Sequence, residues 1–461
     1  MRKSFIIIIL STPIFLAGIA LGAGISLTGD VGINTTSPKA DLEIGAKDPK
    51  INGAVHDAIN LNGAYSVYVS GRYAYVAAYN GDRLTVVDVS VPSSPTVVGS
   101  INDAINLSMA VSVYVCGRYA YVAASAGSCL TVVDVSDPSA PSVVGSIQDT
   151  NKLFGAYSVY VSGRYAYVAA PAGNRLTVVD VSDPSALSIV GSTFDPINLY
   201  GARSVYVSGR YAYVAAYSGD RLSVVDVSDP SAPTVVGSIQ DTISLYGASS
   251  VYVSGRYAYV AAQNGDRLSV VDVSDPSEPS IVGSIQDATA LDGSCSVYAS
   301  GRYVYVAAYN RNRLTVVDVS DPSSPTMIGS LNDSTNLNTA FSVYVSGRYA
   351  YVAAYYSDRL TVVDISGFDS PSADIGDLTV GTINVTENAH VANSLYVDGG
   401  LNLGPGGIKS DGPASISDLL RLTPRSSAPG NPSAGDIYFG TDGYLHLYNG
   451  FEWNYIQMSA E

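Results

Sequence analysis

Tyrosine, aspartate and arginine recur together in short polar segments of the chain. One of these segments reads Tyr79-Asn-Gly-Asp-Arg83. A tyrosine ring can stack on the apolar face of a sugar, and a group of carboxylates can bind a polar saccharide. The candidate ligand-binding residues from such segments are Tyr79, Asp82, Arg83, Tyr217, Asp220, Arg221, Asp266, Arg267, Tyr309, Arg313, Tyr355 and Arg359. Ordinary drift of surface loops predicts the same variation, so the pattern leaves both interpretations open.

A second set of charged residues has a fixed spacing and indicates structure rather than chemistry. Arg72 is followed by Asp88 after 16 residues, and the same step recurs along the chain. Paired arginine and carboxylate groups would tie two turns together, and seven equivalent sites indicate a scaffold. The residues assigned to this structural role are Arg72, Asp88, Arg118, Asp134, Arg164, Asp180, Arg210, Asp226, Arg256, Asp272, Arg302, Asp318, Arg348 and Asp364.

Metal, cofactor and catalytic chemistry have little support in the residue pattern. A third series, which begins at Asp57 and recurs every 46 residues, is expected to cap loops as Asx turns. A calcium-binding acidic ring is the alternative, but no carboxylate-dense calcium loop is present. The chain has only three histidines, and no histidine-based triad or metal centre is expected. Cys116 and Cys129 stand at opposite ends of one expected strand, too far apart for a disulfide.

The charge balance excludes a polyanionic partner. The 461 residues include 24 lysines and arginines against 40 aspartates and glutamates, which gives a net charge of −16. Because binding to a phosphate backbone requires clustered basic residues, nucleic acid is not an expected partner. The 35 tyrosines and 44 glycines indicate many aromatic side chains and many turns.

The elements that must position these residues are repeated seven times. Gly-Arg-Tyr begins at Gly71, Gly117, Gly163, Gly209, Gly255, Gly301 and Gly347, with 46 residues between successive copies. A fixed period of this length made of short strands predicts a β-propeller with one blade per repeat. In the first copy we expect strands a to d at 66–70, 73–79, 84–90 and 96–101. The fold class is all-β, a seven-bladed β-propeller with a smaller C-terminal β-rich, fibre-like region.

The last blade is expected to borrow its outer strand from the N-terminal side. The seventh copy departs from the repeat after Ser366, so its own outer strand is missing. Lys50-Ile51-Asn52-Gly53-Ala54-Val55 aligns with residues 96–101 and precedes the first copy. This segment should complete the seventh blade, close the ring and remove an exposed sheet edge.

The loops of a propeller divide between two faces, and the copies differ mainly on one of them. The a–b turns and c–d connections repeat closely, whereas the b–c and d–a loops vary. This variable face is where a ligand surface would lie. Tyr73 and Tyr75 alternate with small residues along strand b, and together with Tyr68 we assign them to packing between blades.

The core segment Leu-Thr-Val-Val-Asp-Val-Ser-Asp-Pro-Ser resembles the LVIVD repeat. The resemblance covers residues 51 to about 367, and seven copies in register carry it. It implies a prokaryotic surface or secreted β-propeller and supplies no catalytic residue. Val91 and Gly367 depart from the pattern.

The flanks indicate export and attachment. Arg2 and Lys3 precede an apolar run, which predicts a signal peptide or N-terminal anchor over residues 1–24. Residues 25–49 and 435–453 resemble segments of phage tail fibres and bacterial surface fibres. The expected organisation is the signal, a fibre-like linker (25–49), the propeller (50–367), a shaft-like strand repeat (368–423), and a linker with a terminal β-hairpin module (424–461).

These features predict an exported, non-catalytic binding or adhesion protein, secreted or held at the cell surface. A carbohydrate or a surface protein is the expected partner, and the C-terminal region is a candidate for self-association. Contact with a membrane is expected only through an uncleaved N-terminus. The alternatives are a structural surface or matrix component without a ligand, and a secreted hydrolase or lyase with its site in the central channel.

Overall fold

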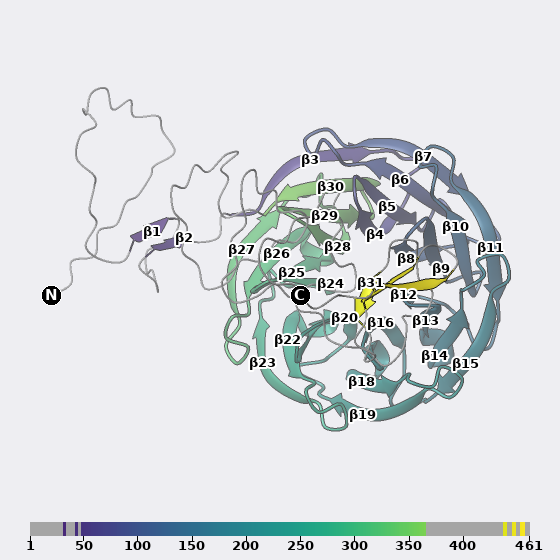
Figure 1. The fold of residues 1–461 in the computed structure, drawn as a ribbon. Helices are drawn as coiled ribbons and strands as arrows, with labels where there is room; N and C mark the ends of the chain where they lie inside the picture. The colour runs from purple at the N-terminus through teal and green to yellow at the C-terminus, as the bar shows by residue number, and fades with distance from the viewer. Residues whose placement is uncertain are drawn as a thin grey trace, which may run out of the picture. The chain divides into compact units, whose positions relative to one another are not determined.

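Seven four-stranded antiparallel sheets form a ring, as the repeat predicted (Figure 1). The computed structural model describes residues 48–365 and the short segments 31–33, 42–44, 437–439, 445–448 and 452–456. Strand a of each blade lies at the centre of the ring, and strand d lies at the outside. The prediction of a seven-bladed propeller is confirmed.

The blades share one order of strands. Blade 1 comprises β4 (Ala64–Ser70), β5 (Tyr73–Ala78), β6 (Arg83–Asp88) and β7 (Thr96–Asn102). Blade 2 has β8 (Ala110–Cys116), β9 (Tyr119–Ala124), β10 (Cys129–Asp134) and β11 (Ser142–Gln148); blade 3 has β12 (Ser158–Ser162), β13 (Tyr165–Ala170), β14 (Arg175–Asp180) and β15 (Ser188–Phe194). Blade 4 has β16 (Ala202–Ser208), β17 (Tyr211–Ala216), β18 (Arg221–Asp226) and β19 (Thr234–Gln240); blade 5 has β20 (Ala248–Ser254), β21 (Tyr257–Ala262), β22 (Arg267–Asp272) and β23 (Ser280–Gln286). Blade 6 has β24 (Ser294–Ser300), β25 (Tyr303–Ala308), β26 (Arg313–Asp318) and β27 (Thr326–Asn332); blade 7 has β28 (Ala340–Ser346), β29 (Tyr349–Ala354), β30 (Arg359–Asp364) and β3 (Lys50–His56). Four b–c loops contain a short 3₁₀ turn, namely η1 (Pro171–Gly173), η2 (Tyr217–Gly219), η3 (Gln263–Gly265) and η4 (Tyr309–Arg311).

In the first blade, two strand boundaries differ from the expected ones by two residues, and the others agree to within one residue. Strand a starts at Ala64 rather than Ser66, because its pairing with strand b continues past a register shift that bulges Tyr65 out of the ladder. Strand c stops at Asp88, because its carboxylate accepts a hydrogen bond from the Ser90 amide in a tight turn (2.9 Å). In the turn between strands a and b, Gly71 supplies the left-handed backbone that the turn requires (φ +58°).

The N-terminal strand closes the ring as predicted. β3 pairs antiparallel with β30, with Lys50 opposite Asp364 and His56 opposite Arg359. Its pairing matches that of β7 with β6 in blade 1, including the position of the register shift. The outer edge of β30 is therefore hydrogen-bonded instead of exposed.

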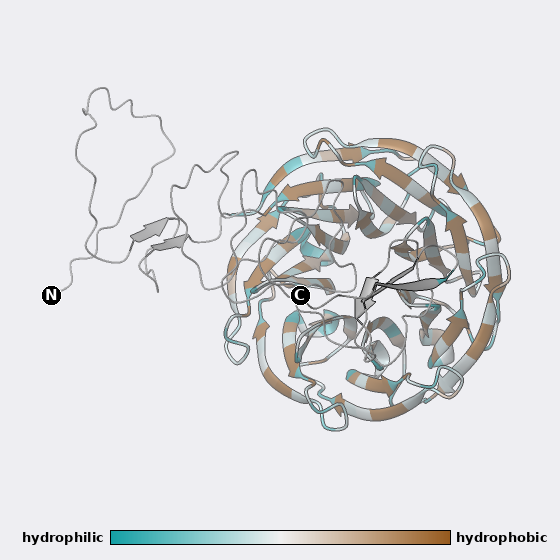
Figure 2. Cartoon of the chain, in the orientation of Figure 1, coloured by the Kyte–Doolittle hydropathy of each residue, from teal (hydrophilic) through white to brown (hydrophobic). Residues whose placement is uncertain are grey.

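The apolar core is divided among the seven interfaces between blades. Each interface joins one face of a blade to the opposite face of its neighbour, and the one between blades 7 and 1 contains Val76, Tyr351 and Leu360. Figure 2 shows hydrophobic residues (brown) along the strands and hydrophilic residues (teal) in the loops at the periphery. Leu61 and its six counterparts are fully buried and anchor the long d–a loops. Because no blade buries its faces alone, stability depends on the complete ring.

A glycine in strand d lets each blade approach the next closely. Gly145, at a register shift in β11, lies against the c–d connection of blade 3. A Cβ atom at this position would stand 2.3 Å from the Pro184 carbonyl oxygen. Backbone, rather than a movable side chain, therefore excludes any larger residue.

We expect Gly145→Ala to destabilise the propeller by about 1–3 kcal/mol, because the clash must separate two blades. The matched control is Gly81→Ala, where the nearest atom to an added Cβ is 3.5 Å away. Urea unfolding followed by fluorescence compares the two variants. Equal midpoints for both would contradict close packing at Gly145.

The segments outside the ring are described only in part. β1 (Val31–Ile33) pairs in parallel with β2 (Leu42–Ile44), and β31 (Ile437–Phe439), β32 (Leu445–Tyr448) and β33 (Trp453–Ile456) form an antiparallel sheet. The predicted signal (1–24) and the shaft-like repeat (368–423) lie outside the described residues. Among the described helices, none combines the length and the apolar character needed to cross a membrane.

Candidate functional site

The face that carries the a–b and c–d turns is occupied by seven ion pairs. Each arginine of the Gly-Arg-Tyr turn donates to the aspartate 16 residues later, as in Arg72 Nη2 to Asp88 Oδ2 (2.5 Å) and Arg348 Nη2 to Asp364 Oδ2 (2.8 Å). The other five pairs are Arg118–Asp134, Arg164–Asp180, Arg210–Asp226, Arg256–Asp272 and Arg302–Asp318. Each arginine also lies over the ring of the following tyrosine, as Arg72 does over Tyr73 at 5.3 Å. The seven arginines of these turns are therefore each neutralised by an aspartate of the same blade.

The aspartates that start the long loops of the other face hold their own turns. Asp103 Oδ1 accepts hydrogen bonds from the amides of Ile105 (3.0 Å) and Asn106 (2.9 Å). These amide donors lower the pKa of Asp103. The same pattern occurs at Asp57, Asp149, Asp195, Asp241, Asp287 and Asp333. The expected Asx turn is confirmed for this series.

The b–c loop aspartates predicted to bind a ligand connect neighbouring blades instead. Asp82 has a left-handed backbone (φ +47°), and its Oδ1 accepts a hydrogen bond from the Met109 amide of blade 2 (2.8 Å). Asp220 and Asp266 bind the amides of Gly247 and Gly293 in the same way (2.8 and 3.0 Å). A ligand could recruit these carboxylates only in competition with bonds that join the blades.

The b–c loop arginines lie along the outer strands. Arg221 Nη1 donates to Ser238 (3.0 Å) and its Nη2 to Gln240 (2.8 Å), both in β19. The equivalent bonds are Arg83 to Ser100, Arg267 to Ser284 and Gln286, and Arg313 to Ser330. Arg359 stands opposite His56 at the start of β30. These side chains are placed far out on strands c and d, away from the strands that line the centre of the ring.

The centre of the ring is lined by two uniform layers from strand a. In one layer, Ser66 and its counterparts accept a hydrogen bond from the strand-a amide of the next blade, and the series closes with Val67 N to Ser342 Oγ (3.3 Å). In the other, Tyr68, Tyr114, Tyr160, Tyr206, Tyr252, Tyr298 and Tyr344 form a closed ring with centroids 4.7–4.9 Å apart. Burial raises the pKa of Tyr160 and Tyr206 to about 12, so these phenols stay protonated. The assignment of Tyr68 to packing is thus refined, since it contacts its counterparts around the channel as well.

The uniformity of the channel ends at its mouth on the variable face. The residue at the position of the strand-a bulge varies from blade to blade, and only blades 1 and 3 share the same residue type. These seven residues, which we call the mouth layer, are Tyr65, Val111, Tyr157, Arg203, Ser249, Cys295 and Phe341. Three small members are buried between the blades, with Ser249 and Cys295 bonded to backbone carbonyls. The four large members lie at the channel mouth with the first residues of the b–c loops. We call Tyr65, Tyr157, Arg203 and Phe341 with Tyr79, Tyr217, Gln263, Tyr309 and Tyr355 the mouth cluster.

One half of the mouth cluster is aromatic. Phe341 stacks on Tyr65 (4.4 Å between centroids) and on Tyr309 (5.4 Å). Tyr79 stacks on Tyr65 at 5.5 Å, and Tyr355 meets Phe341 edge-on at 5.7 Å. Burial raises the pKa of Tyr65 well above its usual value. Three of the predicted ligand tyrosines, Tyr79, Tyr309 and Tyr355, are half-buried here and belong to one connected aromatic group.

The other half is polar and centres on Arg203. Its Nη1 donates to Gln263 Oε1 (2.7 Å) and its Nη2 to the Tyr157 hydroxyl (2.8 Å). The guanidinium carbon lies 4.7 Å from the Tyr217 ring centroid and 5.0 Å from that of Tyr157. Gln263 Nε2 in turn donates to the Tyr309 hydroxyl (3.1 Å) and joins the two halves.

Exposed aromatic side chains gather on the same blades as Arg203. At the end of the d–a loop, blades 3, 4 and 5 carry Phe154, Tyr200 and Tyr246, which are 49%, 50% and 46% exposed. The equivalent residues of blades 1, 2, 6 and 7 are Asn62, Ser108, Asp292 and Asn338. We call Phe154, Tyr200 and Tyr246 the aromatic crescent. Each precedes a residue of the mouth layer by three positions, so crescent and polar half occupy one sector.

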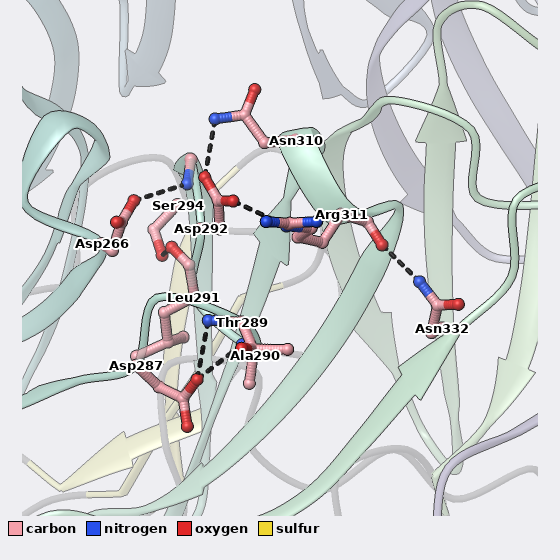
Figure 3. A network of polar contacts seen from close by, with 11 residues as sticks. Asp266, Asp287, Thr289, Ala290, Leu291, Asp292, Ser294, Asn310, Arg311 and Asn332 are labelled. Carbon is pink, nitrogen blue, oxygen red and sulfur yellow. Dashed lines mark hydrogen bonds and ion pairs between the residues drawn. The ribbon is translucent and has the colours of Figure 1, made fainter.

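Blade 6 carries a local exception to the repeat (Figure 3). Asp292 accepts hydrogen bonds from Asn310 Nδ2 (2.8 Å) and Arg311 Nε (2.9 Å), and the Arg311 carbonyl accepts one from Asn332. Five of the other blades have glycine at the position of Arg311. The charges of Asp292 in the d–a loop and Arg311 in the b–c loop therefore neutralise each other, so we assign this pair a structural role.

The described part of the chain contains no cluster of His, Cys, Asp or Glu that could hold a metal ion. Its cysteines are unpaired, with Cys116 exposed and the other two buried. None of the seven mouth-layer positions is a carboxylate or a histidine. The residues of the mouth cluster offer aromatic rings for stacking and polar groups for hydrogen bonds.

Comparison with known protein families agrees with this architecture. The LVIVD repeat matches seven times, at residues 63–103, 108–149, 155–195, 201–241, 247–287, 293–333 and 339–373. The chain belongs to the LVIVD repeat family. Each LVIVD match begins near the end of a d–a loop and, in the first six copies, ends at the aspartate that starts the next loop.

Similar solved structures share the fold of this LVIVD protein. Virginiamycin B lyase from Staphylococcus aureus aligns with a TM-score of 0.55 at 8% identity, over 69% of this chain and 99% of the lyase chain. Hydrazine synthase from Kuenenia stuttgartiensis aligns with a TM-score of 0.53 at 18% identity, over 67% and 97%. At these identities the likeness concerns the propeller alone. No curated protein matches the chain significantly.

Sequence reasoning did not single out the residues at the centre of the site. Arg203, Tyr157 and Phe341 were visible as changes at one repeat position, directly after a nearly constant alanine. The bulge that turns this position toward the channel has no signal of its own in the sequence, because its neighbours alternate as in any strand.

Proposed function

We propose that this protein is a non-catalytic binding protein that holds a saccharide on the blade 3–5 sector of its variable face. The observation that carries the proposal is the coincidence of two departures from the repeat. The aromatic crescent and the polar half of the mouth cluster both lie on blades 3, 4 and 5. A sevenfold scaffold does not require one sector to differ from the others. Binding of a ligand that lacks sevenfold symmetry does require such a difference.

The chemistry of the sector suits a sugar. Exposed rings of Tyr200 and Tyr246 offer flat apolar surfaces, and stacking on them buries the C–H faces of pyranoses. The Asn264 carboxamide, held by the Tyr217 hydroxyl (3.0 Å), supplies a donor and an acceptor for hydroxyl groups nearby. The net charge of −16 and the lack of a basic surface disfavour nucleic acid.

The proposal includes location and attachment. The apolar N-terminal run supports export, and we propose that the protein acts outside the cytoplasm, secreted or at the cell surface. The C-terminal region, with its strands β31 to β33, is the candidate for attachment or self-association. The lyase and synthase neighbours share only the fold at 8% and 18% identity, so the proposal rests on the residues of this sector alone.

Saccharide arrays followed by calorimetry test this function. We expect Tyr200→Ala and Tyr246→Ala each to weaken binding by about 3- to 10-fold, since each removes one stacking surface. Tyr356→Ala is the matched control, an exposed aromatic residue of the same face but in blade 7. An intact protein that binds no saccharide, or crescent variants that bind as the control does, would contradict the proposal. Capture of a protein partner by the crescent would do so as well.

A further inference from the structure

We propose that Arg203 binds the carboxylate of an acidic sugar at the channel mouth. This inference rests on the proposed saccharide function and names the ligand class more narrowly. It follows from the position of Arg203 among the arginines of the ring, from its surroundings and from its unused donors.

Arg203 differs from the other arginines of the ring in the chemical groups that surround its guanidinium. The arginines of the Gly-Arg-Tyr turns pair with aspartates, and Arg311 pairs with Asp292. The b–c loop arginines lie near the aspartates of their own rim: the backbone amides of Ser244 and Ile243 lower the pKa of Asp241, and the charge of Arg267 adds to this effect. The groups that contact Arg203 are phenols and an amide, namely Tyr157, Tyr217, Gln263 and Tyr65. Its charge therefore has no carboxylate beside it among the described residues.

Such a charge is costly to shelter from water. Arg203 is only partly exposed, and two aromatic rings within 5.0 Å displace solvent from its guanidinium. A neutral acceptor offsets the lost hydration only in part, and an anion would offset it more fully. In the same low-dielectric surroundings, the attraction to a ligand carboxylate is stronger than it would be on an open surface.

The guanidinium is also oriented for a planar anion. The bonds to Tyr157 and Gln263 each use one N–H of a terminal nitrogen and fix the guanidinium plane, and Tyr65 is a third hydrogen-bonding neighbour. The remaining donors lie in that plane, where a carboxylate can accept two parallel hydrogen bonds. The stacked rings of Tyr65, Phe341 and Tyr309 lie across the mouth and provide an apolar surface for the sugar ring that carries the acid.

The surrounding loops set a limit on the ligand. Seven Asx-turn aspartates start the d–a loops of this same face, and their lowered pKa values keep them charged. A polyanion would meet this negative ring, whereas one carboxylate inserted at the mouth would not need to contact it. The site is thus suited to a saccharide with a single terminal acid.

Calorimetry with three matched tetrasaccharides tests the assignment: one that ends in glucuronate, its methyl ester, and one that ends in glucose. The full chain should bind the acid at least 10-fold more tightly than the ester or the neutral sugar. Arg203→Gln should reduce this preference to within about 2-fold while it leaves binding of the neutral sugar nearly unchanged. Arg203→Lys, which keeps the charge but not the planar fork, should retain only part of the preference.

Arg256→Gln is the control, since it removes one positive charge from the opposite face. Equal affinity of the unaltered protein for the acid and its ester overturns the inference. This comparison does not depend on whether a variant folds. A preference that survives in a folded Arg203→Gln protein overturns it too. A protein that binds all three sugars alike keeps the proposed function and loses only this assignment, whereas one that binds none contradicts both.

Discussion

A chain that lacks residues 1–56 is expected to lose more than about 10 °C of thermal stability relative to one that lacks residues 1–47. The two truncations differ by Asp48, Pro49 and the closing strand β3, which pairs with β30 along its length. Without β3, the edge of β30 is unpaired, and the buried Pro49 no longer lies against Gly329 of blade 6. Because stability is distributed over neighbouring blades, one incomplete blade weakens the whole ring.

Differential scanning calorimetry measures this effect, and a peptide provides the control. A synthetic peptide of residues 48–57 added to the shorter chain should restore most of the lost stability, because it can pair with the open edge. Size-exclusion chromatography should show association of the shorter chain through that edge. Identical melting of the two truncations would mean that β3 does not hold the ring closed.

Acid is expected to unfold the propeller in a steep step below about pH 4. Hydrogen bonds from arginine and serine lower the pKa of Asp180, Asp226 and Asp272 to about 2, and donors from Ser90 and Arg72 do the same for Asp88. A carboxylate whose pKa is lower in the folded state stabilises the fold above its unfolded pKa, about 3.9. That stabilisation is lost as the pH falls through 4 toward 2.

The effect is large because it is repeated, even though one exposed ion pair contributes little. The arginine partners are up to 60% exposed at the side chain, so no single pair dominates. Asp180→Asn should reduce the steepness of the acid transition without removing it. Near-ultraviolet circular dichroism of the tyrosines, recorded during melts from pH 7 to pH 2, follows the transition. A melting temperature that is constant down to pH 2 would contradict the role assigned to these carboxylates.

The scaffold could be predicted from the sequence because its signals are local and repeated. The 46-residue period predicts the number of blades, and the match of Lys50–Val55 to residues 96–101 predicts the closing strand that pairs with β30. The spacing of Arg72 and Asp88 placed both at the same turns because antiparallel pairing brings Tyr73 opposite Asp88. Each inference depended on a short stretch of chain with a known geometry.

The candidate site was harder to predict because it depends on contacts between distant blades. Tyr65 and Tyr157 belong to different blades, yet their hydroxyls meet at the channel mouth. Asp82, which resembled a free ligand residue in its loop, bonds to the amide of Met109 in the next blade. Loop variation singled out one face of the propeller, but only the structure separates the residues that connect blades from those left available on blades 3 to 5.

The closing pair also determines how the ring responds to force. Lys50, where β3 begins, lies opposite Asp364, where β30 ends, so the chain enters and leaves this pair at the same end. A pull applied between the two flanks would therefore peel the strands apart one hydrogen bond at a time, rather than load all of their bonds together in shear. A propeller tethered through both flanks would open at low tension. If it were tethered through a single flank, no force would act between β3 and β30.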